Sequence, residues 1–473
     1  MSQEIPIPKE LWDLIPSAAQ AALLVFLGNL QTELIDLRQQ VADLNARLGK
    51  NSQNSSKPPS SDAPSLKRPP PRESSGRRRG AQPGHELHRR PLLPPDEEIP
   101  RKPNACRRCG AALTGSDPQP LRHQVIELPP IKPLVTEYQL HRLVCPCCGT
   151  STCASLPEGV PVGQQGPRLQ ATLAVLTGAY RLSKDQAETL CDDLFRIPIC
   201  PGTICQLEQQ TTEALAPVVE ELQQHIKTKH ANLDETGWRE EGKRAWLWVA
   251  VTAMVTVFHI ARSRGAAVAR SLLGPGLHWV VTSDRYSAYQ WLALRRRQLC
   301  WAHLRRDFQA MIDRNNSGSS IGQELLLFSD DVFHWWYRVR DGTLRRSSLL
   351  TYIAEQRPWL RTLLKKGSVC GCAKTVGVCR ALLKLEPALW TFLRVVGVEP
   401  TNNAAVRAVR HAVVWRKSSY GTASAKGSRY VAHILSVIAT CRQQGRNVLE
   451  FVTACCQARL QGRTPPSLLP TPA

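Results

Sequence analysis

Apolar residues recur at alternating spacings of four and three between residues 20 and 48. This spacing places them on one seam of a helix, at the a and d positions of a coiled coil. The seam consists of Leu23, Leu27, Leu30, Leu34, Leu37, Val41, Leu44 and Leu48. The following segment, KNSQNSSKPPSSD, cannot form a neighbouring core. We therefore predict a leucine-zipper-like helix that pairs with another copy of the chain. The alternative is packing on the chain's own core.

The pattern changes twice before the centre of the chain. Residues 49–104 are rich in Pro, Ser and Arg and nearly free of aliphatic clusters, which is typical of a disordered basic linker. Its Arg77, Arg78 and Arg79 are candidates for contact with DNA phosphates, and a simple spacer is the alternative. Residues 163–228 show helical periodicity, with Ser183 and Gln186 as a capping box. They predict a helix-turn-helix-like DNA-binding region, or else a helical spacer.

Strand periodicity begins near Asp234. A short strand ending at this residue, a turn at Gly242 and the apolar strand AWLWVAVTAMVTVFHI are followed by a strand over residues 278–282 that ends in Asp284. The two aspartates are 50 residues apart. Strand-end carboxylates so arranged are the layout of a ribonuclease-H-like sheet, in which neighbouring strands present oxygen ligands to two divalent ions such as Mg²⁺.

The remaining segments complete the predicted organisation. We expect an α/β ribonuclease-H-like core over residues 229–430, with a helical insertion at about 310–395. Two further helices follow over residues 431–463, and residues 464–473 form a tail. A chain of 473 residues is too long for one hydrophobic core, which agrees with several domains.

Charge narrows the class of partner. Sixty-one Lys and Arg residues against 39 Asp and Glu give a net charge of +22, which favours a polyanion. Nucleic acid is the first expectation and an acidic membrane surface the second. We find no apolar run close to the roughly 20 residues that span a bilayer, and no signal peptide, so we expect a cytoplasmic protein without a membrane partner.

Four of the sixteen cysteines form two Cys-x-x-Cys pairs, Cys106 with Cys109 and Cys145 with Cys148, separated by 35 residues. Two such turns complete a tetrahedral site for a structural Zn²⁺, because four thiolates leave no open position for catalysis. We predict a zinc-binding module over residues 105–155, with two strands in QVIELPPIKPLVTEYQLHRLVC. Cys147 and Cys153 leave the choice of sulfur ligands open.

Basic residues flank the predicted strands. Those expected to line a DNA groove are His303, Arg305, Arg306, Arg407, Arg410, Arg416 and Lys417. The alternative for any one of them is a solvated basic surface.

Several motifs together resemble the insertion sequence 66 family of DDE transposases. They are LDETGW from Leu233, SDRYSAY from Ser283, CWAHLRRDF from Cys300, VEPTNNAAVRAVR from Val398, the N-terminal LNARLGKNSQNSSKPPSSD and the paired CxxC motifs. The resemblance implies a transposase with a zipper-like segment, a zinc module, a helical DNA-binding region and a ribonuclease-H-type core. It also implies that Asp234 and Asp284 are the first and second catalytic carboxylates, binding Mg²⁺ or Mn²⁺.

One position departs from that family. The third carboxylate is a Glu in a motif of the form NNxxER, and here Val406 stands in its place. An isopropyl group cannot coordinate a metal ion, and Glu399 is separated from the expected helix by Pro400. Two functions remain open: a transposase that binds double-stranded DNA at terminal inverted repeats as a homo-oligomer, with or without accessory proteins from the same element, or a catalytically silent DNA-binding competitor or repressor of transposase descent.

Overall fold

The computed structural model describes residues 9–51, 55, 57 and 91–469. The chain divides into one unit of Met1–Pro64, Tyr138–Glu188 and Ile199–Ala473, and a second of Ser65–Glu137 and Thr189–Pro198. Much of the linker predicted over residues 49–104 lies outside the described residues, and so do Arg77, Arg78 and Arg79.

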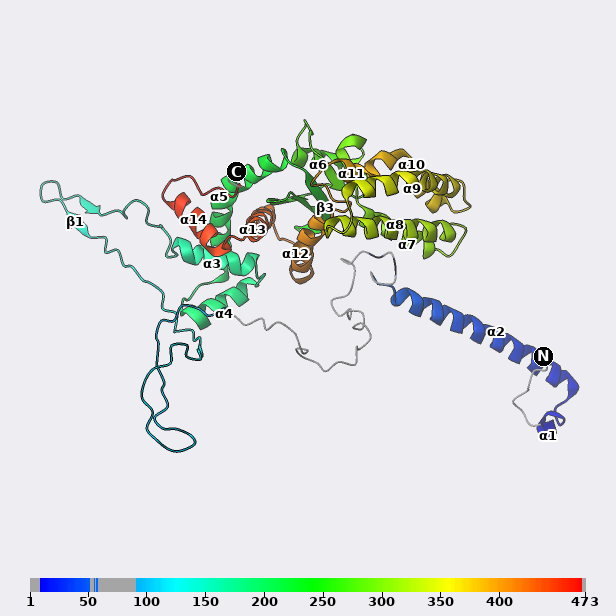
Figure 1. Cartoon of the computed structure of the whole chain (residues 1–473), viewed down its shortest axis with the longest axis horizontal. Coiled ribbons are helices and arrows are strands. Elements are labelled where there is room, and N and C mark those ends of the chain that lie inside the picture. Colours follow the sequence, from blue (N-terminus) through cyan, green and yellow to red (C-terminus); the bar gives the residue numbers. More distant parts are fainter. Residues whose placement is uncertain (1–8, 52–54, 56, 58–90, 470–473) are drawn as a thin grey trace. The chain divides into compact units, whose positions relative to one another are not determined.

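The N-terminal segment is helical. After the short helix α1 (Lys9–Trp12), the 32-residue helix α2 (Ser17–Leu48) contains the whole predicted seam (Figure 1). The seam is uncovered over most of its length: Leu34 is 51% exposed and Leu48 82%.

The same helix corrects the expectation that no apolar run approaches membrane-spanning length. Ser17–Ala42 is long and apolar enough by length and composition, with a mean hydropathy of 1.3. Core helices of soluble proteins and signal sequences have the same length and apolar composition, so these properties are weak support for a membrane span.

The cysteine-rich region holds a single described hairpin. Strand β1 (Arg142–Val144) pairs antiparallel with β2 (Ser151–Cys153). Of the two strands predicted in residues 124–145, only one short strand forms, at Arg142–Val144. Pro129, Pro130 and Pro133 lack the N–H group that a sheet ladder needs, which explains the difference.

Three helices follow: α3 (Pro167–Gly178), α4 (Lys184–Phe195) and α5 (Pro201–Ile226). The predicted capping box at the start of α4 is confirmed. The backbone N–H of Gln186 donates to the Ser183 hydroxyl at 3.1 Å, and the backbone N–H of Ser183 donates to the side-chain oxygen Oε1 of Gln186 at 3.0 Å. Two orphan donors of the helix start are thereby satisfied.

The central sheet, which contains the strand labelled β3 in Figure 1, has the strand order β5-β4-β3-β6-β7. Its strands are β3 (Ala231–Glu240), β4 (Lys243–Val251), β5 (Thr256–Ala261), β6 (Val281–Ser283) and β7 (Arg297–Leu299). Strands β3, β4 and β5 are antiparallel neighbours, whereas β3, β6 and β7 are parallel neighbours. Both Glu241 and Gly242 have positive φ, at 53° and 70°, which makes the tight turn from β3 to β4.

The segment AWLWVAVTAMVTVFHI, predicted as one strand, is a hairpin. Its chain reverses between β4 and β5, where the backbone N–H of Thr252 donates to the carbonyl of Val255 at 2.8 Å. The Thr252 hydroxyl accepts from the backbone N–H of Val255 at 3.0 Å. A turn built from Thr-Ala-Met-Val carries no Gly or Pro signal, so the apolar pattern conceals it.

Helices follow or separate the later strands. They are α6 (Ala266–Leu273), α7 (Trp301–Ile312), α8 (Ser319–Arg340), α9 (Arg346–Gly367), α10 (Ala373–Leu385), α11 (Thr391–Arg394), α12 (Asn403–Ser419), α13 (Ala425–Gln443) and α14 (Val448–Leu460). The predicted helices over residues 310–395 and the two after 430 are confirmed as helices. One hydrophobic core joins the sheet to α3, α5, α12, α13 and α14, and a second lies among α7 to α11.

Both edges of the sheet are covered. On β5, the backbone N–H groups of Thr256 and Phe258 donate to hydroxyls of α13, those of Thr440 at 3.1 Å and Ser436 at 2.8 Å. On β7, the Thr391 hydroxyl donates to the carbonyl of Arg297 at 2.7 Å. Helix and loop side chains thus take the hydrogen bonds that a further strand would make.

Candidate active site

Strand register brings Asp234 and Asp284 to neighbouring positions. In the parallel pair β3–β6, Ala231 is opposite Val281 and Asn232 is opposite Thr282, an offset of 50 residues. The two aspartates have the same offset, so extending the ladder past the end of β6 puts Asp284 beside Asp234, on the same face of the sheet. One expectation was wrong: β3 continues to Glu240, so Asp234 lies within the strand and not at its end.

The Asp234 carboxyl group lies deep in the fold although part of the side chain stays accessible. Burial raises its pKa to about 8, and repulsion from the carboxylates of Glu235 and Asp284 adds to this effect. The backbone N–H of Glu235, which donates to Asp234 Oδ1 at 3.0 Å, and the nearby charge of Arg306 act in the opposite direction. A cation at this place would relieve the repulsion.

Glu235 is a further buried acid that sequence reasoning did not single out, although it belongs to the LDETGW motif. Its carboxylate forms an ion pair with Arg264 at 2.8 Å and accepts a 2.5 Å hydrogen bond from the Tyr289 hydroxyl. Burial raises the pKa of Glu235, and Asp284 raises it further. With both oxygens engaged by protein groups, Glu235 is the anchor of Arg264 and Tyr289.

Two more charged residues, Arg297 and Asp307, interact with Asp284 through a hydrogen bond and through charge. Arg297 is fully buried and donates from Nη2 to the backbone carbonyl of Asp284 at 2.7 Å. Burial lowers the pKa of Arg297 to about 10, and its Nε and Nη1 have no partner among the described residues. Asp307 on α7 is ion-paired with Arg285 at 2.9 Å, and its pKa is raised by burial and by Asp284. The pattern of apolar residues in the sequence predicts neither the hydrogen bond of Arg297 nor the ion pair of Asp307.

The basic residues predicted on α7 fall into different environments. Arg305 forms an ion pair with Asp330 and donates to the Ser329 hydroxyl at 2.8 Å, so it joins α7 to α8. Arg306 lies within electrostatic reach of Asp234. Burial and, to a smaller extent, the charge of Arg306 lower the pKa of His303 to about 3, so His303 is neutral at pH 7.

The basic residues predicted on α12 also differ among themselves. Arg416 donates to the Thr236 hydroxyl at 3.1 Å and to the carbonyl of Gly237, which holds α12 against β3. Arg407, Arg410 and Lys417 are exposed on the same helix.

Val406 lies near the start of α12, at the end that is fixed to the sheet. The side-chain amide of Asn402 donates to the carbonyl of Leu233, the neighbour of Asp234, at 3.0 Å. Val406 is four residues later, one helical turn on, and half-buried, so it shares the Asn402 face of α12. Glu399 is exposed and precedes Pro400.

The two cysteine pairs adopt the same local turn. In the first, the backbone N–H of Cys106 donates to the carbonyl of Ala111 at 2.8 Å, and that of Gly110 donates back to Cys106 at 2.9 Å. In the second, Cys145 and Thr150 form the corresponding 2.9 Å bond. Gly110 and Gly149 have positive φ, at 73° and 68°.

Both turns favour thiolates. Hydrogen bonds from the backbone of Cys109 and Arg108 lower the pKa of Cys106, and a side-chain hydrogen bond with Thr150 lowers that of Cys148 to about 7. Cys153 lies on β2, within the hairpin ladder, with its sulfur 3.8 Å from the carbonyl of Leu140. Within the residues that the structure describes, no group of three or more His, Cys, Asp and Glu side chains is arranged to hold a metal ion.

Comparison with known proteins adds the family. Two uncharacterized proteins of Sinorhizobium fredii are similar to this chain. Protein y4qI is 27% identical over 244 residues, covering 46% of this chain and 44% of its own length. Protein y4hP is 24% identical over 385 residues, covering 72% and 68%.

Three family matches cover most of the sequence. Residues 7–91 match a family of unknown function, and residues 103–149 match the zinc-finger binding domain of transposase IS66. Residues 162–430, more than half of the chain and including Asp234 and Asp284, match the Transposase IS66 family. The chain therefore belongs to the IS66 family of transposases.

Proposed function

We propose that this protein is the transposase of an insertion sequence, which binds double-stranded DNA at the terminal inverted repeats and cleaves it with Mg²⁺ or Mn²⁺ held by Asp234 and Asp284. The observation that carries this proposal is the shared 50-residue offset of the β3–β6 register and of the two aspartates. Two carboxylates at one level of adjacent parallel strands are the donor arrangement of two-metal phosphoryl transfer.

The sheet supports a ribonuclease-H-like core for the proposal. The sequence led us to expect neighbouring strands carrying Asp234 and Asp284. The sheet, in the order β5-β4-β3-β6-β7, pairs the strand of Asp234 directly with the strand that precedes Asp284. In this reading, residues 229–430 form the core, residues of about 310–395 are a helical insertion, and residues 163–228 are a helix-turn-helix-like region. His303, Arg306, Arg407, Arg410 and Lys417 are the proposed DNA contacts.

The side chains present suit a divalent cation. Asp234 and Asp284 offer hard oxygen ligands. The pKa of Asp234 is raised first by burial and then by repulsion from Glu235 and Asp284, and a cation would offset that repulsion. When bound, two such ions activate the attacking oxygen and stabilise the leaving oxygen of an in-line displacement. Asp234 and Asp284 hold the ions, and Arg306 lies close enough to Asp234 to attract a DNA phosphate to the same place.

In this proposal, Val406 limits the rate of DNA cleavage. Its apolar side chain occupies the position of the third carboxylate on the Asn402 face of α12, so we expect weak metal binding and slow cleavage. Replacing Val406→Glu should speed cleavage of terminal-repeat DNA on the order of 100-fold, since a ligand to the catalytic metals contributes several kcal/mol to the transition state.

A cleavage assay on purified protein with Mg²⁺ or Mn²⁺ tests this. Val406→Gln is the matched control, because it adds a polar side chain without a carboxylate, and it should stay slow. Asp284→Asn in the Val406→Glu background should abolish cutting. Rapid cleavage by the unaltered protein, equal to that of Val406→Glu, contradicts the role given to Val406.

Val406 also favours a second candidate function, a catalytically silent DNA-binding competitor of transposase descent. The discriminating result is tight binding of terminal-repeat DNA with no cleavage by the unaltered protein in either metal. In both functions we propose that α2 pairs copies of the chain, that Cys106, Cys109, Cys145 and Cys148 hold a structural Zn²⁺, and that the protein acts on DNA in the cytoplasm, with or without accessory proteins of the same element.

A further inference from the structure

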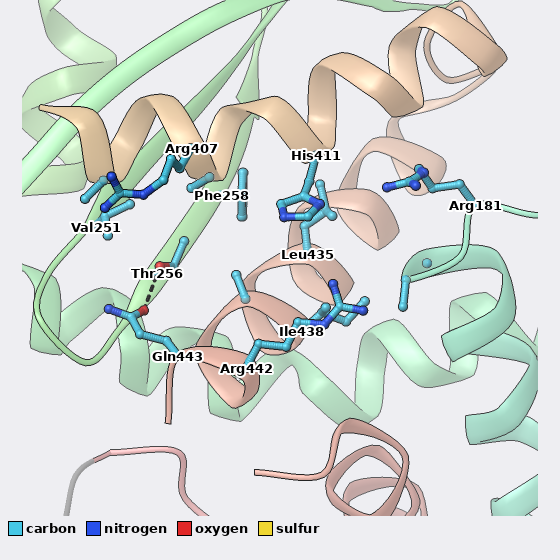
Figure 2. Close-up of a pocket in the computed structure, with 15 residues that line it drawn as sticks. Arg181, Val251, Thr256, Phe258, Arg407, His411, Leu435, Ile438, Arg442 and Gln443 are labelled. Carbon is cyan, nitrogen blue, oxygen red and sulfur yellow. Dashed lines mark hydrogen bonds between the residues drawn. The ribbon is translucent and has the colours of Figure 1, made fainter. Parts of the chain in front are cut away.

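A cavity of about 350 Å³ lies beside the candidate active site, among α3, α12, α13 and the β4–β5 end of the sheet (Figure 2). Its inner wall is apolar, formed by side chains such as Phe258, Leu435 and Ile438 together with the small Ala404 and Ala408. A volume of this size is at the lower end of ligand-binding pockets, which are mostly apolar with a few placed polar groups.

Three of the polar side chains of the cavity are arginines, and burial lowers the pKa of the fourth basic residue, His411, so that its ring is neutral at pH 7. Arg407 and His411 reach it from α12, Arg442 from α13, and Arg181 from the loop after α3 (Figure 2). None of the described lining residues is acidic. The side chains of the three arginines form no ion pair or hydrogen bond with the described part of the chain. By contrast, Arg305 forms an ion pair with Asp330, and Arg416 donates a hydrogen bond to Thr236. Three available guanidinium groups around an apolar floor suit a ligand with an apolar body and an anionic phosphate.

The cavity opens on the same face of the sheet as Asp234. Asp234 is opposite Val249, and Val249 is opposite Phe258, so these three side chains share a face and a level. Val251 and Thr256, which also line the cavity, are opposite each other two residues further along. Adjacent strands are about 4.8 Å apart, which puts β5 about 10 Å from β3.

This spacing fits the reach of a bound DNA strand. Each strand of a duplex advances about 3.4 Å per nucleotide, so the cavity is within about three nucleotides of a phosphate at Asp234 and Asp284. A planar base is too large to enter while stacked in the duplex, and enzymes that need access to a base rotate it out of the helix.

We propose that this pocket binds one unstacked nucleotide of the DNA strand near the cleaved phosphate, with its base on the apolar floor and its phosphate among Arg181, Arg407 and Arg442. The inference rests on the proposed DNA-binding function and extends it to a nucleotide subsite. Arg181 and Arg442 are new DNA contacts in this scheme, and no charge pattern in the sequence points to them.

The test measures binding of the full-length protein to terminal-repeat duplexes by fluorescence anisotropy at one fixed salt concentration. One duplex is fully paired, and the others each carry a single mismatch at successive positions near the end of the repeat. A mismatch removes the cost of unpairing, so wild-type protein should bind one mismatched duplex roughly tenfold more tightly than the paired one.

Three variants assign the preference to the pocket. Ala408→Phe fills the floor and Arg442→Gln removes one guanidinium, and both should bring the mismatched and paired affinities together. Arg429→Gln is the matched control, because Arg429 is exposed on the same helix α13 but does not line the cavity. This control should retain the preference.

The outcomes separate the two levels of inference. Failure to bind even the paired duplex overturns the proposed function. Binding of the paired duplex without any mismatch preference, or a preference that survives in Ala408→Phe, overturns the nucleotide pocket alone. A further arm uses free deoxyadenosine monophosphate: binding that is sensitive to Arg442→Gln, without a mismatch preference, overturns a DNA strand as the source and makes a free nucleotide the occupant.

Discussion

Several ionisable side chains around the candidate site are shielded from solvent, and burial shifts their pKa. Asp234, Glu235 and Asp307 are acids whose pKa is raised by burial, while Arg297 and His303 are bases whose pKa is lowered by it. Such opposed shifts cluster at functional sites, because a site prepared for ions or phosphates retains buried ionisable groups that ordinary packing would replace with apolar ones.

His303 gives a prediction for acid stability. Its pKa in the folded protein, about 3, is below the ordinary value of 6.5, so protonation favours the unfolded chain. Its contribution to stability is complete above pH 6.5 and is lost as the pH falls toward 3. When the pH falls from 7 to 5, the free energy of unfolding should decrease in both proteins. We expect the decrease to be roughly 1–2 kcal/mol smaller in His303→Gln than in wild type.

Urea unfolding at a series of pH values measures this difference. His278→Gln is the control, because His278 is exposed, and it should follow the wild-type curve. Parallel curves for His303→Gln and wild type would show that His303 is not a buried neutral base.

Secondary-structure elements explain how these residues are positioned. Helix α12 is attached at one end by Asn402 to β3 and further along by Arg416 to the same strand. Val406 follows Asn402 by one turn of this helix, while Arg407 and His411 line the cavity. A displacement of α12 would therefore move Val406 and the cavity-lining Arg407 and His411 together.

Helix α13 provides a prediction on the stability of the sheet. The Ser436 hydroxyl, fully buried, accepts the backbone N–H of Phe258 on the edge strand β5. Ser436→Ala leaves that donor without a partner and should lower the free energy of unfolding by about 1–3 kcal/mol. Thr362→Val is the control, since the exposed Thr362 hydroxyl bonds only to the carbonyl of Pro358 in its own helix. An equal loss in both variants, measured by urea unfolding, would argue against a role in covering the edge.

The cysteine turns give a prediction on metal content. We expect one zinc per chain by elemental analysis, and its loss on Cys148→Ala or Cys106→Ala. Cys153→Ala should retain zinc, because Cys153 is part of the β1–β2 ladder. Zinc retained in Cys148→Ala but lost in Cys147→Ala or Cys153→Ala would mean that the ligand set was chosen wrongly.

At the scale of the whole molecule, the exposed seam of α2 is the feature that the rest of the fold leaves unexplained. Replacing Leu34→Glu together with Leu37→Glu should convert oligomers to monomers in light-scattering measurements, because charges at a and d positions oppose helix pairing. Ile35→Glu is the matched control, since Ile35 is equally apolar, 67% exposed and off the seam. If α2 entered a membrane instead, the Ile35 and Leu34 changes would be equally harmful.

The sequence predicted local features better than contacts between distant segments. The helix over residues 20–48, the Ser183 capping box and the turn at Gly242 depend on neighbouring residues, and the structure confirms these local features. Pairing of that helix with a second copy stays a prediction. The hairpin turn at Thr252 was missed because it lacks turn-type residues. One of the two strands in residues 124–145 was wrongly predicted because its alternation was read without the cost of three prolines.

The site was predictable to a different degree. A spacing of 50 residues and the family motifs singled out Asp234 and Asp284, but the surroundings depend on packing that periodicity does not encode. Nothing in the sequence predicts the hydrogen bond from Arg297 to the carbonyl of Asp284. Nor does it predict that Arg181, in the loop after α3, and Arg442, on α13, line one cavity. Likewise, Arg305 and Arg416 look like available cations in the sequence and are engaged in the fold.

The covered edges of the sheet restrict how copies of this protein can join. An open strand invites its equivalent in a second molecule to extend the sheet, a route that leads from ordered pairs to fibrous aggregates. Here Ser436, Thr440 and Thr391 occupy the outer hydrogen-bonding groups of β5 and β7, so strand addition would require helix α13 or the Thr391 segment to detach first. Copies of this protein are therefore expected to meet through surfaces other than the edges of this sheet.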